Sequence, residues 1–186
     1  MKTNRWQVAL HESGHAVSTI VMGGRCDGVA LLDDTSGLCQ SSELLGDREA
    51  FCIASGPAAE ILAEEYPAPN CTPAESRTLT VDEIESLPIC KTAPFLATQL
   101  ARTESDRTDG PSDDRRIALW AISSHEDQPE LWARRVVRAH RIAADIVQRN
   151  ATAIAAVATE LYMRGSLCGP EVLSISEKHG SFHGTF

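Results

Sequence analysis

Positively charged residues are scarce in this sequence, and lysine is almost absent. Only 3 of the 17 basic residues are lysines, and 26 acidic residues give the 186-residue chain a formal net charge of −9. This balance argues against a nucleic-acid or anionic-membrane partner, because phosphates would repel the chain. No lysine follows a glycine, so the GxxxxGK phosphate-binding loop is also missing. We therefore expect no ATP binding on this chain.

Long hydrophobic runs are missing as well. No apolar stretch approaches the length of a membrane span, and His11, Glu12 and His15 stand where a secretory signal would be apolar. The six cysteines are widely spread and none forms a CxxC pair. We interpret them as free thiols rather than as disulfides or structural zinc ligands. These absences predict a cytoplasmic protein.

The composition is that of a soluble globular domain. Apolar residues make up 42% of the chain and charged residues 23%, which is enough to bury one continuous core. Prolines punctuate a polar stretch over residues 66–111, which we interpret as an insertion. We predict a single domain over residues 1–178 that contains this insertion, followed by a flexible tail over residues 179–186.

Helical periodicity and capping signals predict a mainly α fold. A first helix over residues 4–22 begins at a capping box formed by Asn4 and Gln7. Further helices are expected over residues 47–65, 112–124 and 128–150, with a continuation to Arg164. Ser55-Gly56-Pro57 should break or kink the second of these helices. Residues 28–45 predict a small β-hairpin with GVALL and LCQSS as its strands.

The clearest motif is HESGH at residues 11–15, which matches HExxH. Because four residues make about one helical turn, His11 and His15 share a helix face and can bind one Zn²⁺ together. Glu12 points about 100° away around the helix and can act as general base on a water molecule. The motif predicts a catalytic metal site with Zn²⁺ as cofactor; a chance match is the competing interpretation.

A catalytic zinc needs a third protein ligand, and the sequence offers three candidates. They are Glu60, Asp113 and Asp114. Asp114 would share a helix face with Ala118 and Ala121, a small apolar surface suited to the interior. A carboxylate near a helix N-terminus, however, often only complements the helix dipole. Spacing alone leaves the choice open.

Four stretches resemble, in order, the FtsH-type peptidases, which are membrane-anchored ATP-dependent zinc proteases. They are VALHESGHAV, SGPAAEIL, GPSDDRRIALWAI and IVQRNATAIAAVATELYMRGSLCGPEVLSI. These stretches are similar to the family's HEAGHAV zinc helix, its GGRAAEEL and GASNDLxxAT segments, and its C-terminal helices. The resemblance covers most of the chain outside residues 66–110 and implies a helical, zincin-like peptidase domain.

The resemblance also implies roles for individual residues. His11 and His15 match the zinc ligands, and Glu12 matches the catalytic glutamate. Aligning GPSDD with GASND assigns the third ligand to Asp114 and places Glu60 in a supporting helix. The chain departs from the family at Pro57, which stands where the family has arginine, and it shows neither an ATPase module nor a membrane anchor.

Together these features predict a zinc-dependent metallopeptidase that hydrolyses short or unfolded polypeptides. A strand edge of the hairpin could align an extended substrate, and His125 and His140 are candidates for stabilising the oxyanion. A homo-oligomer or a separate ATPase partner is left open. One alternative is a non-catalytic zinc-binding module descended from such a peptidase. The other is an all-α interaction protein with an accidental motif.

A row of arginines is the remaining feature of the sequence. Arg134, Arg138, Arg141 and Arg149 recur along one side of a predicted helix. Such a row could dock an acidic partner, but charge stripes at helical spacing usually mark a solvated face. We predict a solvated face.

Overall fold

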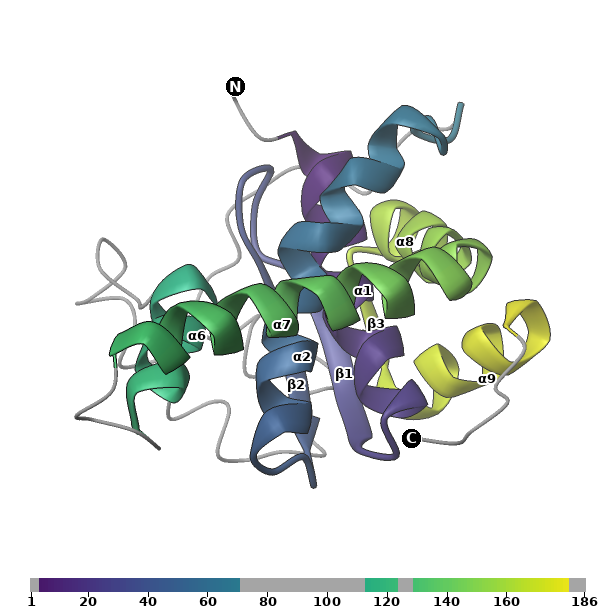
Figure 1. The fold of residues 1–186 in the computed structure, drawn as a ribbon. Helices are drawn as coiled ribbons and strands as arrows, with labels where there is room; N and C mark the ends of the chain where they lie inside the picture. Colours follow the sequence, from purple (N-terminus) through teal and green to yellow (C-terminus); the bar gives the residue numbers. More distant parts are fainter. Residues whose placement is uncertain (1–3, 71–112, 124–128, 181–186) are drawn as a thin grey trace.

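The computed structural model describes residues 4–70, 113–123 and 129–180 (Figure 1). The N-terminal elements are α1 (Arg5–Val21), β1 (Arg25–Leu31), β2 (Gly37–Ser42), α2 (Asp47–Ala59) and the 3-10 helix η1 (Glu60–Glu64). The C-terminal elements are α6 (Asp113–Ser123), α7 (Pro129–Arg149), α8 (Ala151–Arg164), β3 (Ser166–Cys168) and α9 (Gly169–His179). The predicted class, mainly α with a small β element, is confirmed.

Helix α1 begins where its sequence predicts and occupies the centre of the fold. The Gln7 backbone N–H donates to Asn4 Oδ1 at 2.9 Å, and the Asn4 N–H donates to Gln7 Oε1 at 3.1 Å. This reciprocal pair satisfies two N–H groups that a helix start leaves free. Trp6, Leu10 and Val17 are buried in the main core together with residues of β1, α8 and α9. The helix is therefore held rigidly along its length.

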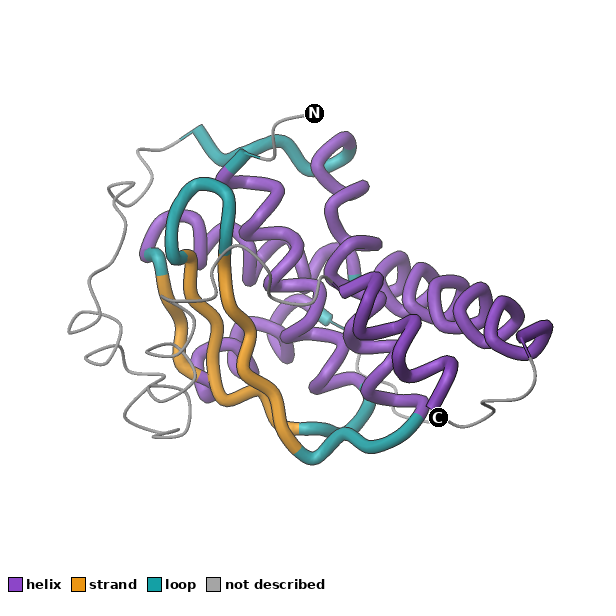
Figure 2. Tube along the Cα trace, turned by 90° about the vertical axis from the view of Figure 1, so that its left-hand side faces the viewer, coloured by secondary structure: helices purple, strands orange, loops and turns teal. Residues whose placement is uncertain are grey.

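Strands β1 and β2 form the predicted antiparallel hairpin, with Val29 opposite Cys39. Strand β3 pairs with the other edge of β1, so the strand order is β2-β1-β3. Figure 2 shows the three strands together on one side of the helices. Strand β3 was not predicted from the sequence, because its three residues are too few to show an alternating pattern. Gly165, with φ of 78°, ends α8 in the left-handed conformation that favours glycine and leads into β3.

Helix α2 runs through Pro57 without a break. It ends at Ala59 and continues as the 3-10 helix η1, so the change in helical geometry comes after the predicted Ser55-Gly56-Pro57 site. Ala54 and Ala59 are fully buried. This packing outweighs the local tendency of proline to end a helix.

Helix α6 is placed by a small core cluster of its own. Its residues Ile117 and Ala121 are fully buried. Ile117 packs with residues of α2 and α7, namely Ile53, Ala54, Ala139 and Ala143. The Arg135 guanidinium of α7 lies 4.1 Å from the centre of the Trp120 ring and 3.4 Å from Asp47 Oδ1, linking α6, α7 and α2. These contacts fix α6 against α2 and α7.

Some of the other predictions fall only partly on residues that the structure describes. Most of the predicted insertion, and residues 181–186 of the predicted tail, lie outside them, so the domain boundaries stay predictions. The four cysteines that the structure describes are free. The four arginines of the α7 row are exposed, as predicted. None of the described helices is long and apolar enough to cross a bilayer.

The contact between α1 and α2 yields a first prediction. A Cβ at Gly14 would lie 2.6 Å from both Ala59 Cβ and the Ser55 carbonyl oxygen. We expect Gly14→Ala to lower the free energy of unfolding by about 1–3 kcal/mol in urea denaturation, because the two helices must move apart. As control, Ser18→Ala removes a buried hydroxyl that has no hydrogen-bond partner among the described residues. The control should not lower stability; an unchanged Gly14→Ala protein would contradict the close packing.

Candidate metal centre

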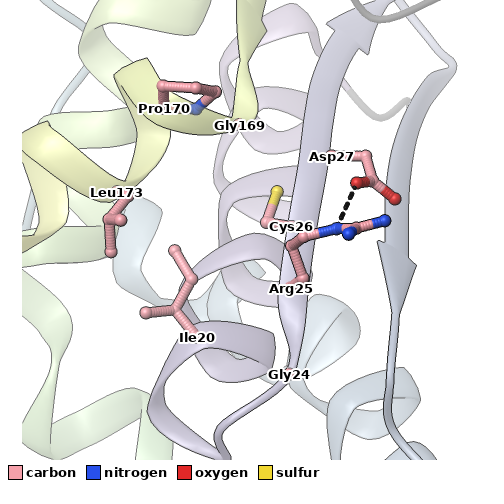
Figure 3. A pocket seen from close by; sticks show the side chains of 8 residues that line it. All are labelled: Ile20, Gly24, Arg25, Cys26, Asp27, Gly169, Pro170 and Leu173. Atoms are coloured by element: carbon pink, nitrogen blue, oxygen red, sulfur yellow. Dashed lines mark hydrogen bonds and ion pairs between the residues drawn. The ribbon is translucent and has the colours of Figure 1, made fainter. Parts of the chain in front are cut away.

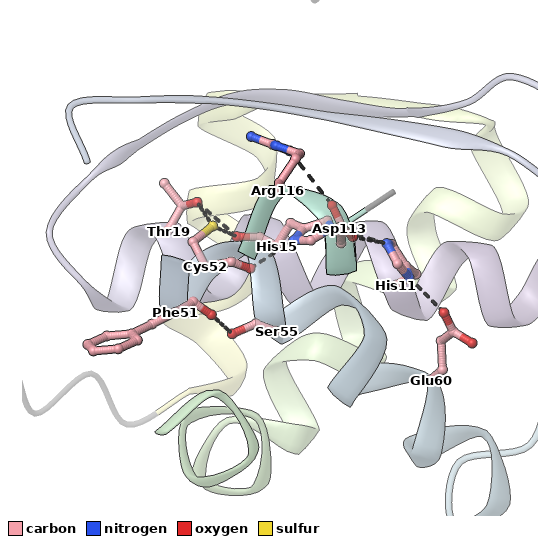
Figure 4. A network of polar contacts seen from close by, with 9 residues as sticks. All are labelled: His11, His15, Thr19, Phe51, Cys52, Ser55, Glu60, Asp113 and Arg116. Atoms are coloured by element: carbon pink, nitrogen blue, oxygen red, sulfur yellow. Dashed lines mark hydrogen bonds and ion pairs between the residues drawn. The ribbon is translucent and has the colours of Figure 1, made fainter. Parts of the chain in front are cut away.

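Three side chains from two distant parts of the chain converge at one point (Figure 4). His11 and His15 lie one turn apart on α1, with their Nε2 atoms 3.1 Å apart. Asp113 Oδ2, from α6, lies 3.0 Å from His11 Nε2 and 3.1 Å from His15 Nε2. Within the part of the chain that the structure describes, this is the one group of His, Cys, Asp or Glu side chains that could hold a metal ion.

The outer nitrogens of both imidazoles are held by oxygen atoms of α2 and η1. His15 Nδ1 lies 2.8 Å from the Cys52 carbonyl oxygen, and His11 Nδ1 lies 2.7 Å from Glu60 Oε1. A carbonyl oxygen can only accept, so the His15 Nδ1 must carry the proton and donate it. The same tautomer at His11 lets Nδ1–H donate to Glu60. In the neutral rings, both Nε2 lone pairs then face Asp113 Oδ2, which is the usual arrangement around metal-binding histidines.

The donor set fits a divalent metal ion. Three lone-pair acceptors within 3.1 Å repel one another unless positive charge lies between them. Tetrahedral ligands of zinc, at about 2.0–2.1 Å from the ion, are separated from each other by about 3.3 Å, close to the spacing seen here. Gly56 adds a second observation. A Cβ there would lie 2.3 Å from His15 Nε2 and 2.7 Å from His11 Nε2, so glycine keeps the space beside both atoms free.

The electrostatics of the three side chains also favour a bound cation. Burial by itself would lower the pKa of His15, but the hydrogen bond to Asp113 raises that pKa well above its usual value. The pKa of His11 is also raised, because its hydrogen bond to Asp113 outweighs burial. Burial would raise the pKa of Asp113, but the two histidines hold it well below its usual range. The carboxylate therefore stays ionised and attracts any cation, whether proton or metal.

Glu12 lies beside the cluster but is not part of it. Its side chain is only 7% exposed, and burial raises the pKa of its carboxyl group although the charges of His15 and His11 act in the opposite direction. The start of β2 packs directly against it, since a Cβ at Gly37 would come within 2.5 Å of Glu12 Cγ. Glu12 is thus a buried carboxylate held between α1 and the hairpin.

The carboxylate that contacts the two histidines is not the one that the resemblance to FtsH-type peptidases implied. The carboxylate at the histidines is that of Asp113, whereas the resemblance assigned this role to Asp114, whose side chain lies outside the described atoms. The buried face of α6 runs through Ile117 and Ala121, while Ala118 is exposed. Asp113 stands four residues before Ile117 and so shares its face. The prediction for Asp114 relied on Ala118 and Ala121, of which Ala121 is buried and Ala118 is exposed. Asp114 as a ligand stays a prediction, because its side chain lies outside the described atoms.

The contacts that hold the two histidine Nδ1 atoms were not predicted from the sequence. Glu60 was a candidate third ligand from its residue type and belonged to a supporting helix by the resemblance, but its contact with His11 Nδ1 was not predicted. The Cys52 carbonyl has no sequence signal, because any residue supplies a carbonyl oxygen. Of the proposed oxyanion groups, His140 lies on α7 and is not one of the three residues of the cluster, and His125 lies outside the described residues.

A separate pocket lies away from the metal cluster. It has a volume of about 340 Å³ and opens between the end of α1, the start of β1 and the start of α9 (Figure 3). Ile20, Cys26, Pro170 and Leu173 are among its lining residues. The lining includes none of the three metal-cluster residues, so the pocket is not part of the candidate centre.

Separate substitutions of Asp113 and Asp114 test which of these two carboxylates binds the metal ion. We expect Asp113→Asn to weaken Zn²⁺ binding by at least about 100-fold, because an amide oxygen carries no charge. Competition with a chromophoric chelator measures this affinity. Asp114→Asn removes the same charge one residue away and should bind Zn²⁺ like the parent. The reverse pattern would return the role to Asp114.

The raised histidine pKa values predict how metal stabilisation depends on pH. Protonation of His11 and His15 stabilises the metal-free fold fully below about pH 6.5, and this contribution is lost as the pH rises through their raised pKa values. A metal ion competes with these protons for the same Nε2 atoms. The increase in Tm caused by Zn²⁺ should therefore grow from about pH 6 to about pH 8. A His140→Asn control should show the same trend, and a pH-independent increase would refute competition at these atoms.

Comparison with known proteins relates the N-terminal part of the chain to metallopeptidases. The family model described as Peptidase M50B-like matches residues 3–63, about a third of the chain. The match includes His11, Glu12, His15 and Glu60 but ends before Asp113. It supports a metallopeptidase family of the site-2 protease type and is not specific to FtsH-type peptidases. No curated protein matches the chain.

Proposed function

We propose that this protein is a zinc-dependent metallopeptidase that hydrolyses peptide bonds in short or unfolded polypeptides. The observation that carries the proposal is the convergence of His11 Nε2, His15 Nε2 and Asp113 Oδ2 within 3.1 Å of one another. Three protein ligands are the number typical of catalytic zinc sites, whereas structural sites usually have four. A zinc ion held by these three groups would supply Lewis acidity, which lowers the pKa of a water molecule and polarises a carbonyl group.

Glu12 would move the protons in this reaction. Its carboxylate takes a proton from the attacking water and passes it to the amine that leaves when the peptide bond breaks. Burial supports this role, because it raises the pKa of the carboxyl group towards neutrality and makes the carboxylate a better proton acceptor. Packing against Gly37 holds the side chain in one place.

The hairpin offers a way to align an extended substrate. Among the described residues, β2 pairs with β1 alone, so its outer edge has backbone groups available for a further strand. Gly37, the first residue of β2, touches Glu12. A polypeptide added to this edge would therefore run past the general base. Such a strand must be extended, which favours short or unfolded chains.

Descent from an FtsH-type peptidase is the finer part of the proposal. The order of the site residues supports it: the histidine pair comes first, then Glu60 in a supporting helical segment, and finally a carboxylate at the start of a later helix. Degradation of folded proteins would need a separate ATPase partner, in line with the absence of a phosphate-binding loop in this sequence.

Substitution of the general base tests the catalytic function. We expect Glu12→Gln to retain Zn²⁺ but to lose at least about 100-fold in the rate of cleavage of fluorescently labelled, unfolded casein, because the amide cannot accept the proton. Zinc content is measured on the same samples. Glu64→Gln, an equivalent change at an exposed position of η1, should cleave like the parent.

The outcomes separate the competing functions. A protein that binds one Zn²⁺ but shows no cleavage that depends on Glu12 would be a non-catalytic zinc-binding module. A protein that binds no Zn²⁺ would make the HExxH match accidental. Either result would overturn the peptidase proposal.

A further inference from the structure

Arg116 is a cationic side chain next to the metal centre with no role so far. It lies on α6 one turn after Asp113, and its Nη1 is 3.7 Å from Asp113 Oδ1. Figure 4 shows Arg116 on one side of Asp113, while Glu60 lies beyond His11. The guanidinium is thus beside the carboxylate oxygen that does not face the histidines.

The Arg116 donors remain available to another molecule. The side chain is 47% exposed, and 3.7 Å to Asp113 Oδ1 is too long for a hydrogen bond. Among the described residues, Asp113 is its one ion-pair partner. A metal ion at the centre would also neutralise part of the Asp113 charge, which weakens the attraction that holds Arg116 there. The charge of the exposed arginine would then be largely uncompensated.

We infer that Arg116 is a specificity-determining residue that binds a carboxylate of the substrate, so that the enzyme prefers anionic peptides. The inference rests on the proposed peptidase function and names its substrate class. A guanidinium presents a planar set of donors that matches a carboxylate with two parallel hydrogen bonds. Because Arg116 adjoins Asp113, a carboxylate bound to it lies close to the bond being cleaved. The carboxylate comes either from an acidic side chain or from the peptide's C-terminus.

A pair of zinc-binding probes tests this recognition without requiring turnover. Succinic acid monohydroxamate carries a carboxylate, and the corresponding succinamide hydroxamate carries a neutral amide of the same shape. We expect the zinc-loaded Glu12→Gln protein to bind the carboxylate probe about 10-fold more tightly, as measured by calorimetry. Arg116→Gln should reduce this ratio to about one, and Arg116→Lys should keep part of it.

A matched control separates local recognition from the net charge of the protein. Arg138→Gln removes the same charge at an exposed position of α7 and should keep the preference. A preference that survives Arg116→Gln, or that is absent from the parent, overturns the inference. Zinc content is measured for the parent and for each variant. A parent that binds no zinc would overturn the proposed function together with this inference, whereas a zinc-loaded parent without a preference, or loss of zinc from Arg116→Gln alone, overturns the inference alone.

Cleavage of two peptide pairs by the unsubstituted enzyme then identifies the source of the carboxylate. One pair differs by Glu against Gln within the peptide, and the other by a free against an amidated C-terminus. A higher kcat/KM for one charged member, abolished by Arg116→Gln, supports recognition of that source. Equal kcat/KM values within both pairs contradict substrate recognition by Arg116.

Discussion

Two imidazole nitrogens and a carboxylate oxygen are held in mutual contact although their lone pairs repel, and the proposed function depends on this constraint. The imidazoles cannot easily turn away, because Glu60 and the Cys52 carbonyl hold their Nδ1 groups. Gly56 leaves the adjoining space open. Positive charge is needed to make the arrangement favourable, and either protons or a divalent ion can supply it. The same atoms therefore link the stability of the fold to its proposed chemistry.

The residues of the candidate site come from two helices, one packed in the main core and one in a smaller cluster. Helix α1 carries the histidines and Glu12 and is also the centre of the main core, so these groups sit on a rigid element. Helix α6 carries Asp113 and Arg116 and is held by a smaller cluster around Ile117. In our proposal, two of the three metal ligands and the general base thus lie on the better-packed helix. The residue that recognises the substrate in our proposal, Arg116, lies on α6, which packs in the smaller cluster.

Local signals predicted much of this structure, and tertiary contacts account for the rest. Asn4 and Gln7 predicted the start of α1, and the HExxH spacing placed both histidines on one face, because these features depend on neighbours in the sequence. Strand β3 exists only through its pairing with β1 and left no pattern of its own. Which acidic residue of α6 faces the histidines depends on how the helix packs. Ile117 and Ala121 mark its buried face, whereas Ala118, which the sequence had also suggested for that face, is exposed.

The long separation between the ligands along the chain has a consequence for folding. His15 and Asp113 are 98 positions apart, yet both would hold the same ion. A metal bound there acts as a cross-link that closes a very long loop, much as a disulfide would, and it restricts the unfolded chain only if both ends stay attached. Metal loading would thus tie α1 directly to α6, in addition to the core contacts that already join α1 to α8 and α9.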